Sequence, residues 1–339
     1  MQVYEIRAAF GLDHLTPAER PLPEPGPRQV RVRLHALSLN YRDLMMVQGT
    51  YNPRLVRPRV PVSDGVGTVV ALGAGVQRVR VGDRVAGTFF QGWVDGDLDE
   101  AKARTDLGGT RDGLLAEEAV LEEDGVIAVP DHLSDAEAAT LPCAALTAWN
   151  AVVETGRVAP GGTVLVQGMG GVSTFALLFA KRAGARVVVL SSSPERLDRA
   201  RALGADEGVD YRREPEWDKR VRALTGGRGV DLVVEVGGAG TLPRSLRAVR
   251  MGGTIALIGV LAGAGQVDPL PAVMRQIRLA GIFVGSRAMF ERMNAAIALH
   301  RLRPVLDRVF PFSQAVAALR HLESGSHFGK IVLALGPGA

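Results

Sequence analysis

The residues with the clearest chemical potential form a glycine-rich turn near the middle of the chain. A short apolar run, residues 163–167, precedes the turn, and a helical pattern over 174–183 follows it. The turn consists of Gly168, Met169, Gly170, Gly171, Val172 and Ser173. Bare backbone lets phosphates come close, and a helix N-terminus adds free N–H groups and a partial positive charge. A second apolar run at 186–190 follows at the right distance, so the pattern predicts a dinucleotide pyrophosphate site. The alternative is an ordinary glycine turn.

The residues after the second apolar run bear on which dinucleotide is bound. Ser191 stands where an NAD-specific fold usually carries Asp or Glu for the ribose 2′-hydroxyl. The hydroxyls of Ser191 and Ser192 can donate to a 2′-phosphate, and Arg196 can pair with it. A plain loop in which Ser193 caps the next helix is the alternative, and both can hold at once. The sequence therefore favours NADPH over NADH.

Further nucleotide contacts are expected at the carboxyl ends of the later apolar runs, where parallel sheets bind ligands. These candidates are Val236, Gly259, Val260, Phe283 and Gly285. Tyr211 is a candidate for stacking on the adenine ring.

The periodicity of the chain indicates two kinds of structure. Residues 1 to about 125 are typical of irregular β-structure, with strands at 29–36, 66–72 and 84–87 and a long loop at 91–113. After Pro130 the apolar runs alternate with helical patterns. Strands are expected near 163–167, 186–190, 231–236, 254–260 and 280–285, and helices near 172–184, 194–203, 216–225, 240–250 and 287–300.

This alternation predicts an α/β Rossmann domain with a parallel, doubly wound sheet at 125–303. The segments 1–124 and 304–339 are expected to form a catalytic domain with an irregular β-barrel-like fold. A last strand at 331–335 is expected to pair back into the first part of the chain.

Composition excludes several classes of protein. The 339 residues carry 40 basic and 36 acidic side chains without a dense basic block, which argues against nucleic-acid binding. No apolar run is long enough for a membrane span, and the first residues lack a signal-peptide pattern, so a cytoplasmic protein is expected. The single cysteine, Cys143, excludes an internal disulfide and a cysteine-rich zinc site.

Short motifs over nearly the whole length resemble one enzyme family. They lie at 38–43 (Ser-Leu-Asn-Tyr-Arg-Asp), 63–67, 81–85, 147–149, in the turn at 168–173, and at 327–330 (His-Phe-Gly-Lys). Together they make the chain similar to the zinc-independent, quinone-oxidoreductase-like branch of the medium-chain dehydrogenases/reductases. The resemblance also suggests that Phe328 and Lys330 lie at the cofactor, with Lys330 reaching a phosphate or ribose; a solvated lysine is the alternative.

Zinc-dependent members of this superfamily bind the metal with Cys, His and Cys. The matching positions here are Asn40, Ser63 and Cys143, so two of the three ligands are missing. The loop at 91–113 has none of the four cysteines that a structural zinc site needs. We therefore expect a zinc-free protein.

The resemblance implies hydride transfer from the nicotinamide to an activated acceptor, a quinone or an α,β-unsaturated carbonyl, whose developing charge is stabilised by hydrogen bonds. It places Asn40 and Tyr51 beside the nicotinamide, and the spacing adds Tyr41; ordinary packing is the alternative for both tyrosines. Asp64 replaces the acidic residue that follows the missing zinc histidine. Thr147 either faces the nicotinamide or caps a helix.

Two other functions stay open at this point: a zinc-independent alcohol or ketone dehydrogenase, and a cofactor-binding protein without relevant turnover. In each case the partner is a small molecule. We also expect a homodimer formed on the apolar sheet edge near 282–285, beside the helix at 289–299.

Overall fold

The computed structural model describes residues 1–259, 263 and 265–336, and it divides the chain into two compact units. Unit 1 comprises Met1–Leu146 and Gly285–Ala339, and unit 2 comprises Thr147–Val284. The sequence predicted junctions near residues 124 and 304, so unit 1 includes more of the chain at both junctions than expected.

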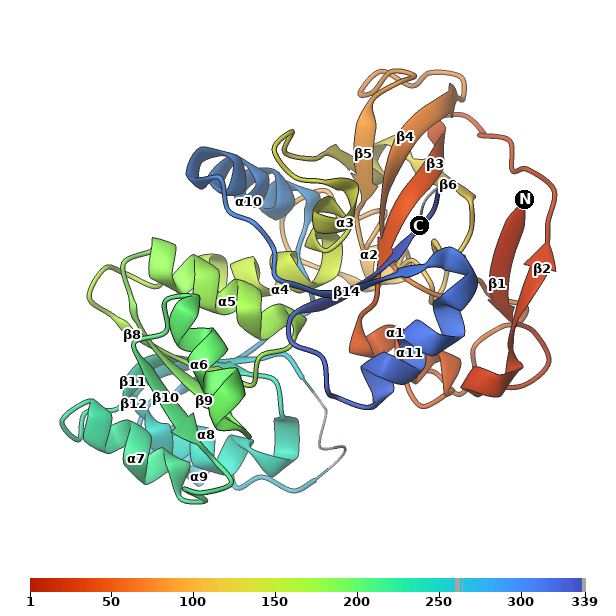
Figure 1. Ribbon diagram of the computed structural model, residues 1–339. Coiled ribbons are helices and arrows are strands. Elements are labelled where there is room, and N and C mark those ends of the chain that lie inside the picture. The colour runs from red at the N-terminus through yellow and green to blue at the C-terminus, as the bar shows by residue number, and fades with distance from the viewer. Residues whose placement is uncertain (260–262, 264, 337–339) are drawn as a thin grey trace. The chain divides into compact units, whose positions relative to one another are not determined.

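Unit 2 is built on a six-stranded parallel sheet (Figure 1). Its strands are β8 (Thr163–Gln167), β9 (Arg186–Ser191), β10 (Glu207–Asp210), β11 (Val230–Glu235), β12 (Val249–Leu257) and β13 (Arg278–Gly281). They lie in the order β10-β9-β8-β11-β12-β13, and every neighbouring pair is parallel. Numbered along the chain this is 3-2-1-4-5-6, the order of a dinucleotide-binding Rossmann fold, and it confirms the predicted fold class.

Helices connect these strands, as the alternating pattern predicted. They are α5 (Gly171–Arg182), α6 (Pro194–Ala202), α7 (Trp217–Leu224), α8 (Leu242–Ala248) and α9 (Leu270–Met274). The strand β10 was missed because only Val209 in its four residues is a strong apolar strand former. The last predicted strand, 280–285, is placed too far along the chain, since β13 ends at Gly281. As β13 is the edge strand and Leu279 on it is exposed, pairing between two copies there stays a prediction.

Unit 1 contains the irregular β-structure that the sequence predicted. A two-stranded sheet joins β1 (Gln2–Ile6) to β2 (Leu15–Glu19). A larger sheet has the order β14-β15-β3-β4-β5-β7, with β6 also pairing with β3. Its strands are β3 (Gln29–Ser38), β4 (Asp64–Leu72), β5 (Arg84–Gly87), β6 (Glu118–Glu122), β7 (Val126–Ala128), β14 (Leu306–Pro311) and β15 (Lys330–Ala334).

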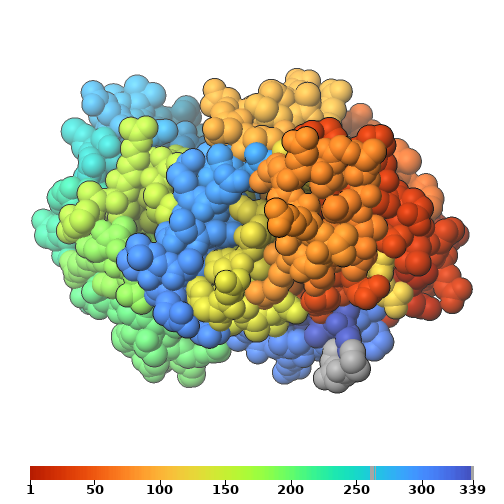
Figure 2. Space-filling view, turned by 90° about the horizontal axis from the view of Figure 1, so that it is seen from above, coloured from red at the N-terminus to blue at the C-terminus, as the bar shows by residue number. Residues whose placement is uncertain are grey.

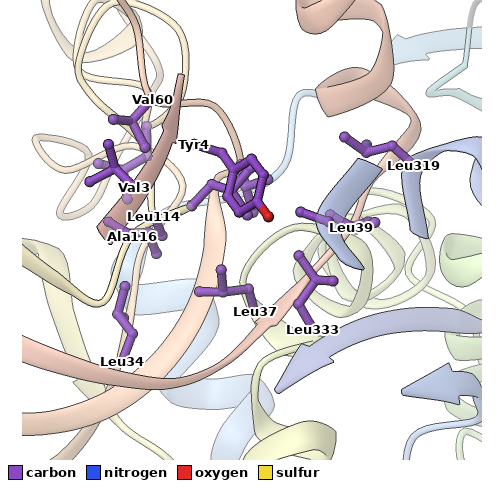
Figure 3. Packing of buried hydrophobic residues seen from close by; sticks show 14 of the residues in the cluster. Val3, Tyr4, Leu34, Leu37, Leu39, Val60, Leu114, Ala116, Leu319 and Leu333 are labelled. Atoms are coloured by element: carbon purple, nitrogen blue, oxygen red, sulfur yellow. The ribbon is translucent and has the colours of Figure 1, made fainter. Parts of the chain in front are cut away.

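Strand β3 organises this sheet. Apolar residues alternate along it, and Val30, Val32 and Leu34 on one face are buried. The C-terminal strand β15 pairs with it in antiparallel fashion, so the predicted return of the tail is confirmed. Leu37 of β3 and Leu333 of β15 belong to the same apolar core (Figure 3).

The helical segments of unit 1 are short apart from two near the end of the chain. They are α1 (Tyr41–Val47), α2 (Glu100–Ala103), α3 (Asp135–Ala138), α10 (Arg287–His300) and α11 (Ala315–Glu323), and α11 lies beside α1 (Figure 1). A capping box opens α3, with Ser134 and Glu137 bonded to each other's backbone N–H groups. The long loop at 91–113 contains α2.

Helix α10 belongs to unit 1 because its first turn is bonded there. The backbone N–H groups of Arg287 and Ala288 donate to the carbonyls of Trp93 and Val94, each at 2.9 Å. The Arg287 guanidinium also pairs with Asp124 at 2.7 Å. Figure 2 shows this helix in blue against the orange segment around residue 90. None of the helices in the described ranges is long and apolar enough to cross a membrane.

Close packing of β3 against β4 gives a first prediction. A Cβ atom on Gly67 of β4 would lie 2.0 Å from the Arg33 carbonyl oxygen, so Gly67→Ala must separate the strands. We expect a loss of about 3 kcal/mol in the free energy of unfolding, measured with urea. Gly281→Ala is the control, since a Cβ there meets nothing within 4 Å. Equal stability of the two variants would contradict this packing.

Candidate active site and nucleotide site

A buried lysine marks the candidate active site of unit 1. Register places Val332 of β15 opposite Ser38 of β3, which brings Lys330 to the end of β3. The Lys330 side chain is 2% exposed, and its Nζ donates to the Leu39 carbonyl at 2.6 Å and to Asn40 Oδ1 at 2.5 Å. Burial lowers the pKa of Lys330, and the charge of Asp64 opposes that shift.

Asp64 lies beside this lysine because Ser38 and Asp64 are paired between β3 and β4. Its carboxylate is fully buried and accepts bonds from Ser63 Oγ at 2.7 Å and from the Cys143 backbone N–H at 3.0 Å. Burial raises the pKa of Asp64, whereas the Lys330 charge is the largest opposing influence. Asp64 and Lys330 therefore form a buried pair of opposite charges, each of which favours the charged form of the other.

The Asn40 amide lies within this pair. Its Oδ1 accepts from Lys330, and the amide is close enough to Asp64 to favour the ionised carboxylate. Among the described residues, however, Asn40 Nδ2 has no hydrogen-bond partner of normal geometry, although the atom is buried. A buried donor without a partner is costly, and at a functional site it marks a position for a ligand oxygen.

Helix α1 adds a second buried carboxylate. Asp43 is fully buried, and its Oδ2 accepts from the Asn40 backbone N–H at 2.8 Å. Burial raises the pKa of Asp43 to about 6, against the attraction of Arg42, whose Nη1 lies 3.7 Å from Oδ1. Asp43 fixes the start of α1 and thus the backbone of Asn40, which agrees with a structural role.

Arg42 is a site residue to which the sequence analysis gave no role. Its guanidinium donates to the Leu107 carbonyl at 2.6 Å, pairs with Asp106, and lies 5.5 Å from the centre of the Tyr51 ring. Tyr51 is 39% exposed, and burial of the rest of the ring raises its pKa. A cation held against this ring positions Tyr51 as a wall of the site. The sequence feature that could have pointed to Arg42 is its position in the first turn of α1.

Two other residues that were predicted to be catalytic, Tyr41 and Thr147, have different surroundings from Lys330, Asp64 and Asn40. Tyr41 is 43% exposed at the first position of α1. Thr147 is buried in α4 (Leu146–Trp149), the first residue of unit 2. The capping alternative for Thr147 is wrong, because the chain is already helical from Leu141.

The atoms at the matching zinc positions do not fit a zinc ion. The amide oxygen of Asn40 is bonded to the Lys330 ammonium, and Ser63 Oγ donates to Asp64. Burial raises the pKa of the Cys143 thiol well above its ordinary value, and the Asp64 charge adds to this, so a thiolate ligand is disfavoured. In the described ranges there is also no group of three or more His, Cys, Asp or Glu side chains placed to hold a metal.

The glycine turn of unit 2 has a backbone suited to a pyrophosphate. Gly168 has a φ of +67°, and a Cβ on it would meet nothing within 4 Å, so the space beside the turn is open. Gly170 is the N-cap of α5 and provides no side-chain cap. The first N–H groups of this twelve-residue helix are therefore available to an anion.

A buried polar network holds the strand ends next to this turn. Gln167 at the end of β8 donates to Glu235 at 2.7 Å and to Ser245 at 2.8 Å. Glu235 also accepts from the backbone N–H groups of Gly237 and Gly238, at 2.9 and 3.1 Å. Since β8 and β11 are neighbours, the network fixes the loops that follow these two strands relative to each other. The apolar pattern from which the strands were predicted gave no sign of this network.

The predicted nucleotide-specificity residues lie together at the end of β9. Ser191 is 2% exposed, and its carbonyl accepts from the Tyr211 backbone N–H at 3.1 Å. Ser193 caps α6 by accepting from the Arg196 backbone N–H at 3.3 Å, which confirms the capping role. The Tyr211 side chain is 42% exposed. Ser192, the other serine predicted to contact the 2′-phosphate, is partly exposed.

The remaining predicted cofactor residues are more scattered. A Cβ on Gly259 would lie 1.8 Å from the Val236 carbonyl oxygen, so these two loops are in close contact. Phe283 is half exposed, Gly285 begins the second part of unit 1, and the Phe328 side chain is buried. Val260 lies outside the described residues.

Comparisons with known proteins give consistent results. The model "Alcohol dehydrogenase GroES-like domain" matches residues 26–131, and "Zinc-binding dehydrogenase" matches residues 171–299. A zinc-type alcohol dehydrogenase-like protein of Schizosaccharomyces pombe is 43% identical over 331 residues, covering 95% of this chain and 96% of that protein.

Solved structures extend the likeness to the whole fold. A protein of Sinorhizobium meliloti 1021 assigned as an alcohol dehydrogenase is 44% identical, with a TM-score of 0.91 and coverage of 98% of this chain and 99% of that chain. A structure of an NAD-dependent alcohol dehydrogenase is 38% identical, with a TM-score of 0.90 and coverage of 99% and 100%.

The pKa of Asp43 predicts a pH effect on stability. The pKa is about 6 in the folded chain and 3.8 as the ordinary value, so the folded state favours the protonated carboxyl. Asp43 therefore destabilises the fold progressively as the pH rises from about 4 to 6. We expect Asp43→Asn to gain about 3 kcal/mol in unfolding free energy over the wild type between pH 3 and pH 7. Urea unfolding across this range measures the difference, and a constant difference would contradict the burial argument.

Proposed function

Because the chain belongs to the medium-chain dehydrogenase/reductase family, we propose that it is an NADPH-dependent reductase of quinones or α,β-unsaturated carbonyl compounds that works without zinc. The family makes the protein an NAD(P)-dependent oxidoreductase. The class of acceptor and the form of the nucleotide are our proposal. The observation that carries it is the buried Asn40 Nδ2, which makes no hydrogen bond of normal geometry within the described residues. The oxygens of Asn40 and Ser63, which match metal-ligand positions, are already bonded to Lys330 and Asp64.

Unit 2 supports the nucleotide part of the proposal. The turn at 168–173 would take the pyrophosphate, and Ser191, Ser192 and Arg196 would take the 2′-phosphate. Arg213, which follows β10, is an additional candidate that the sequence analysis missed. It is near Glu195, whose pKa is lowered first by its own backbone N–H, then by Ser193, with a contribution from Arg213.

When bound, the nicotinamide supplies a hydride to the electrophilic carbon of the acceptor, and the electron pair of the acceptor moves to its carbonyl oxygen. Asn40 Nδ2 would donate a hydrogen bond to that oxygen as negative charge develops there. Tyr51 would form a flat wall against the conjugated substrate. A proton from solvent would complete the reduced product.

Activated acceptors suit such a site better than simple ketones. A hydrogen bond stabilises an enolate or phenolate oxygen, in which conjugation already spreads the charge. A simple ketone would produce a localised alkoxide, for which a Lewis acid matters more. The alternative is a zinc-independent alcohol or ketone dehydrogenase; the names of the relatives favour alcohol dehydrogenase activity but say nothing in support of zinc independence.

Asn40→Asp tests the role of the amide. The carboxylate still accepts from Lys330, but it removes the donor and adds a negative charge beside the developing oxyanion. We expect kcat/KM for cyclohexenone or a naphthoquinone to fall by about 10²- to 10³-fold. Greater turnover of simple alcohols by the wild type would favour the alternative enzyme. Tight NADPH binding without consumption of any acceptor would instead favour a binding protein.

Arg196→Ala tests the choice of nucleotide. Loss of the guanidinium should lower kcat/KM for NADPH about tenfold and leave NADH almost unchanged, because only NADPH carries the 2′-phosphate. Arg199→Ala, on the same helix, is the matched control. A wild-type preference for NADH would contradict the proposal.

A further inference from the structure

The chain has a buried lysine bonded to Asn40, one of the positions that the resemblance matches to zinc ligands. Lys330 Nζ contacts two neutral oxygens, those of Leu39 and Asn40, at 2.6 and 2.5 Å. Asn40 is itself one of the three positions that match zinc ligands. An ammonium ion bonded to Asn40 Oδ1 prevents that oxygen from serving a metal, since both cations need the same lone pairs.

The surroundings of Lys330 fix its ammonium group in place. Lys330 is 2% exposed, and lysine is almost never buried so far unless it is paired. Its counter-charge is Asp64, also fully buried, which is fixed by Ser63 and the Cys143 backbone. Two buried charges are expensive to keep, and here both interact with one amide: Lys330 donates to Asn40 Oδ1, and the Asn40 side chain favours the ionised Asp64.

The amide transmits the effect of this pair. A cation on Oδ1 and an anion near the amide draw electrons toward the oxygen, which makes the Nδ2 hydrogens better donors. This strengthening requires the charge on Lys330 and not only a hydrogen bond to Asn40.

We propose that the Lys330 ammonium replaces the metal cation electrostatically: it positions and polarises Asn40, so that Nδ2 binds an anionic or carbonyl oxygen of the substrate. This inference rests on the proposed function for the identity of that substrate. Lys330 is a positioning residue in this proposal, since it acts through Asn40.

The test uses a ligand that reports charge without turnover. With NADP⁺ bound, the protein is titrated with 4-nitrophenol, whose absorbance distinguishes phenolate from phenol. The wild type should bind phenolate about tenfold more tightly than phenol, which lowers the apparent pKa of the bound probe by about one unit. Lys330→Gln keeps a donor to Asn40 but removes the charge, and it should abolish this preference. Lys330→Arg should restore most of it.

A second variant keeps the inference testable if Lys330→Gln does not fold. Asp64→Asn removes the counter-charge and should increase the phenolate fraction of the bound probe. Lys181→Met is the control, because that lysine is bonded to Asp206 in unit 2. A wild type without phenolate preference, or a preference that Lys330→Gln retains, would overturn the inference.

Two further outcomes separate this inference from its rivals. Calorimetry with NADPH should give the same Kd for wild type and Lys330→Gln within about twofold. A Kd raised tenfold or more with an unchanged phenolate preference would overturn the inference and assign Lys330 to the nucleotide. If the wild type reduces no quinone or enone but shows the charge-dependent preference, the proposed function fails while the role of Lys330 stands.

Discussion

The site of unit 1 depends on the antiparallel pairing of β3 with β15 on one side and β4 on the other. Ser38 is opposite Val332 in one pair and opposite Asp64 in the other. One point on β3 thus receives a lysine from the end of the chain and a carboxylate from its first quarter. The apolar cluster that includes Leu37, Leu39 and Leu333 holds this register (Figure 3). A slip of one residue would turn these side chains to the other face.

The buried charges explain why the register must be so exact. Lys330 and Asp64 each carry a desolvation cost, and the attraction between their charges opposes the effect of burial on the pKa of each. Asp43 carries the same cost with Arg42 close by, and burial raises its pKa to about 6 despite that positive charge. These groups lower stability in order to define the environment of Asn40. Such a concentration of costly polar groups is typical of a site and not of a packing core.

Local pattern was sufficient to predict the central strands of unit 2, because β8, β9 and β11 are buried along nearly their whole length and appear as short apolar runs. The strand β10 was not predicted, because its pairing with β9, and not its composition, makes it a strand. For unit 1, motif resemblance suggested Asn40, Tyr51 and Asp64 as site candidates but could not predict which groups the Lys330 side chain contacts. That side chain meets Asn40 across a separation of 290 residues, a contact decided by strand register. Arg42 was passed over for the same reason, as its partners Asp106 and Leu107 lie in a loop without periodicity.

An ammonium ion and a divalent metal differ in what they can stabilise. A lysine carries one charge, binds through hydrogen bonds, and here is compensated by Asp64, so the field at a substrate oxygen is weaker than that of a metal bonded to it directly. In the proposed reaction, the charge develops on an oxygen that conjugation already stabilises. A fixed lysine, however, needs no deprotonated thiolate, which agrees with a Cys143 whose pKa is raised by burial. In the proposed function, the missing metal ligands and the buried lysine therefore belong together, and both favour acceptors that are already activated.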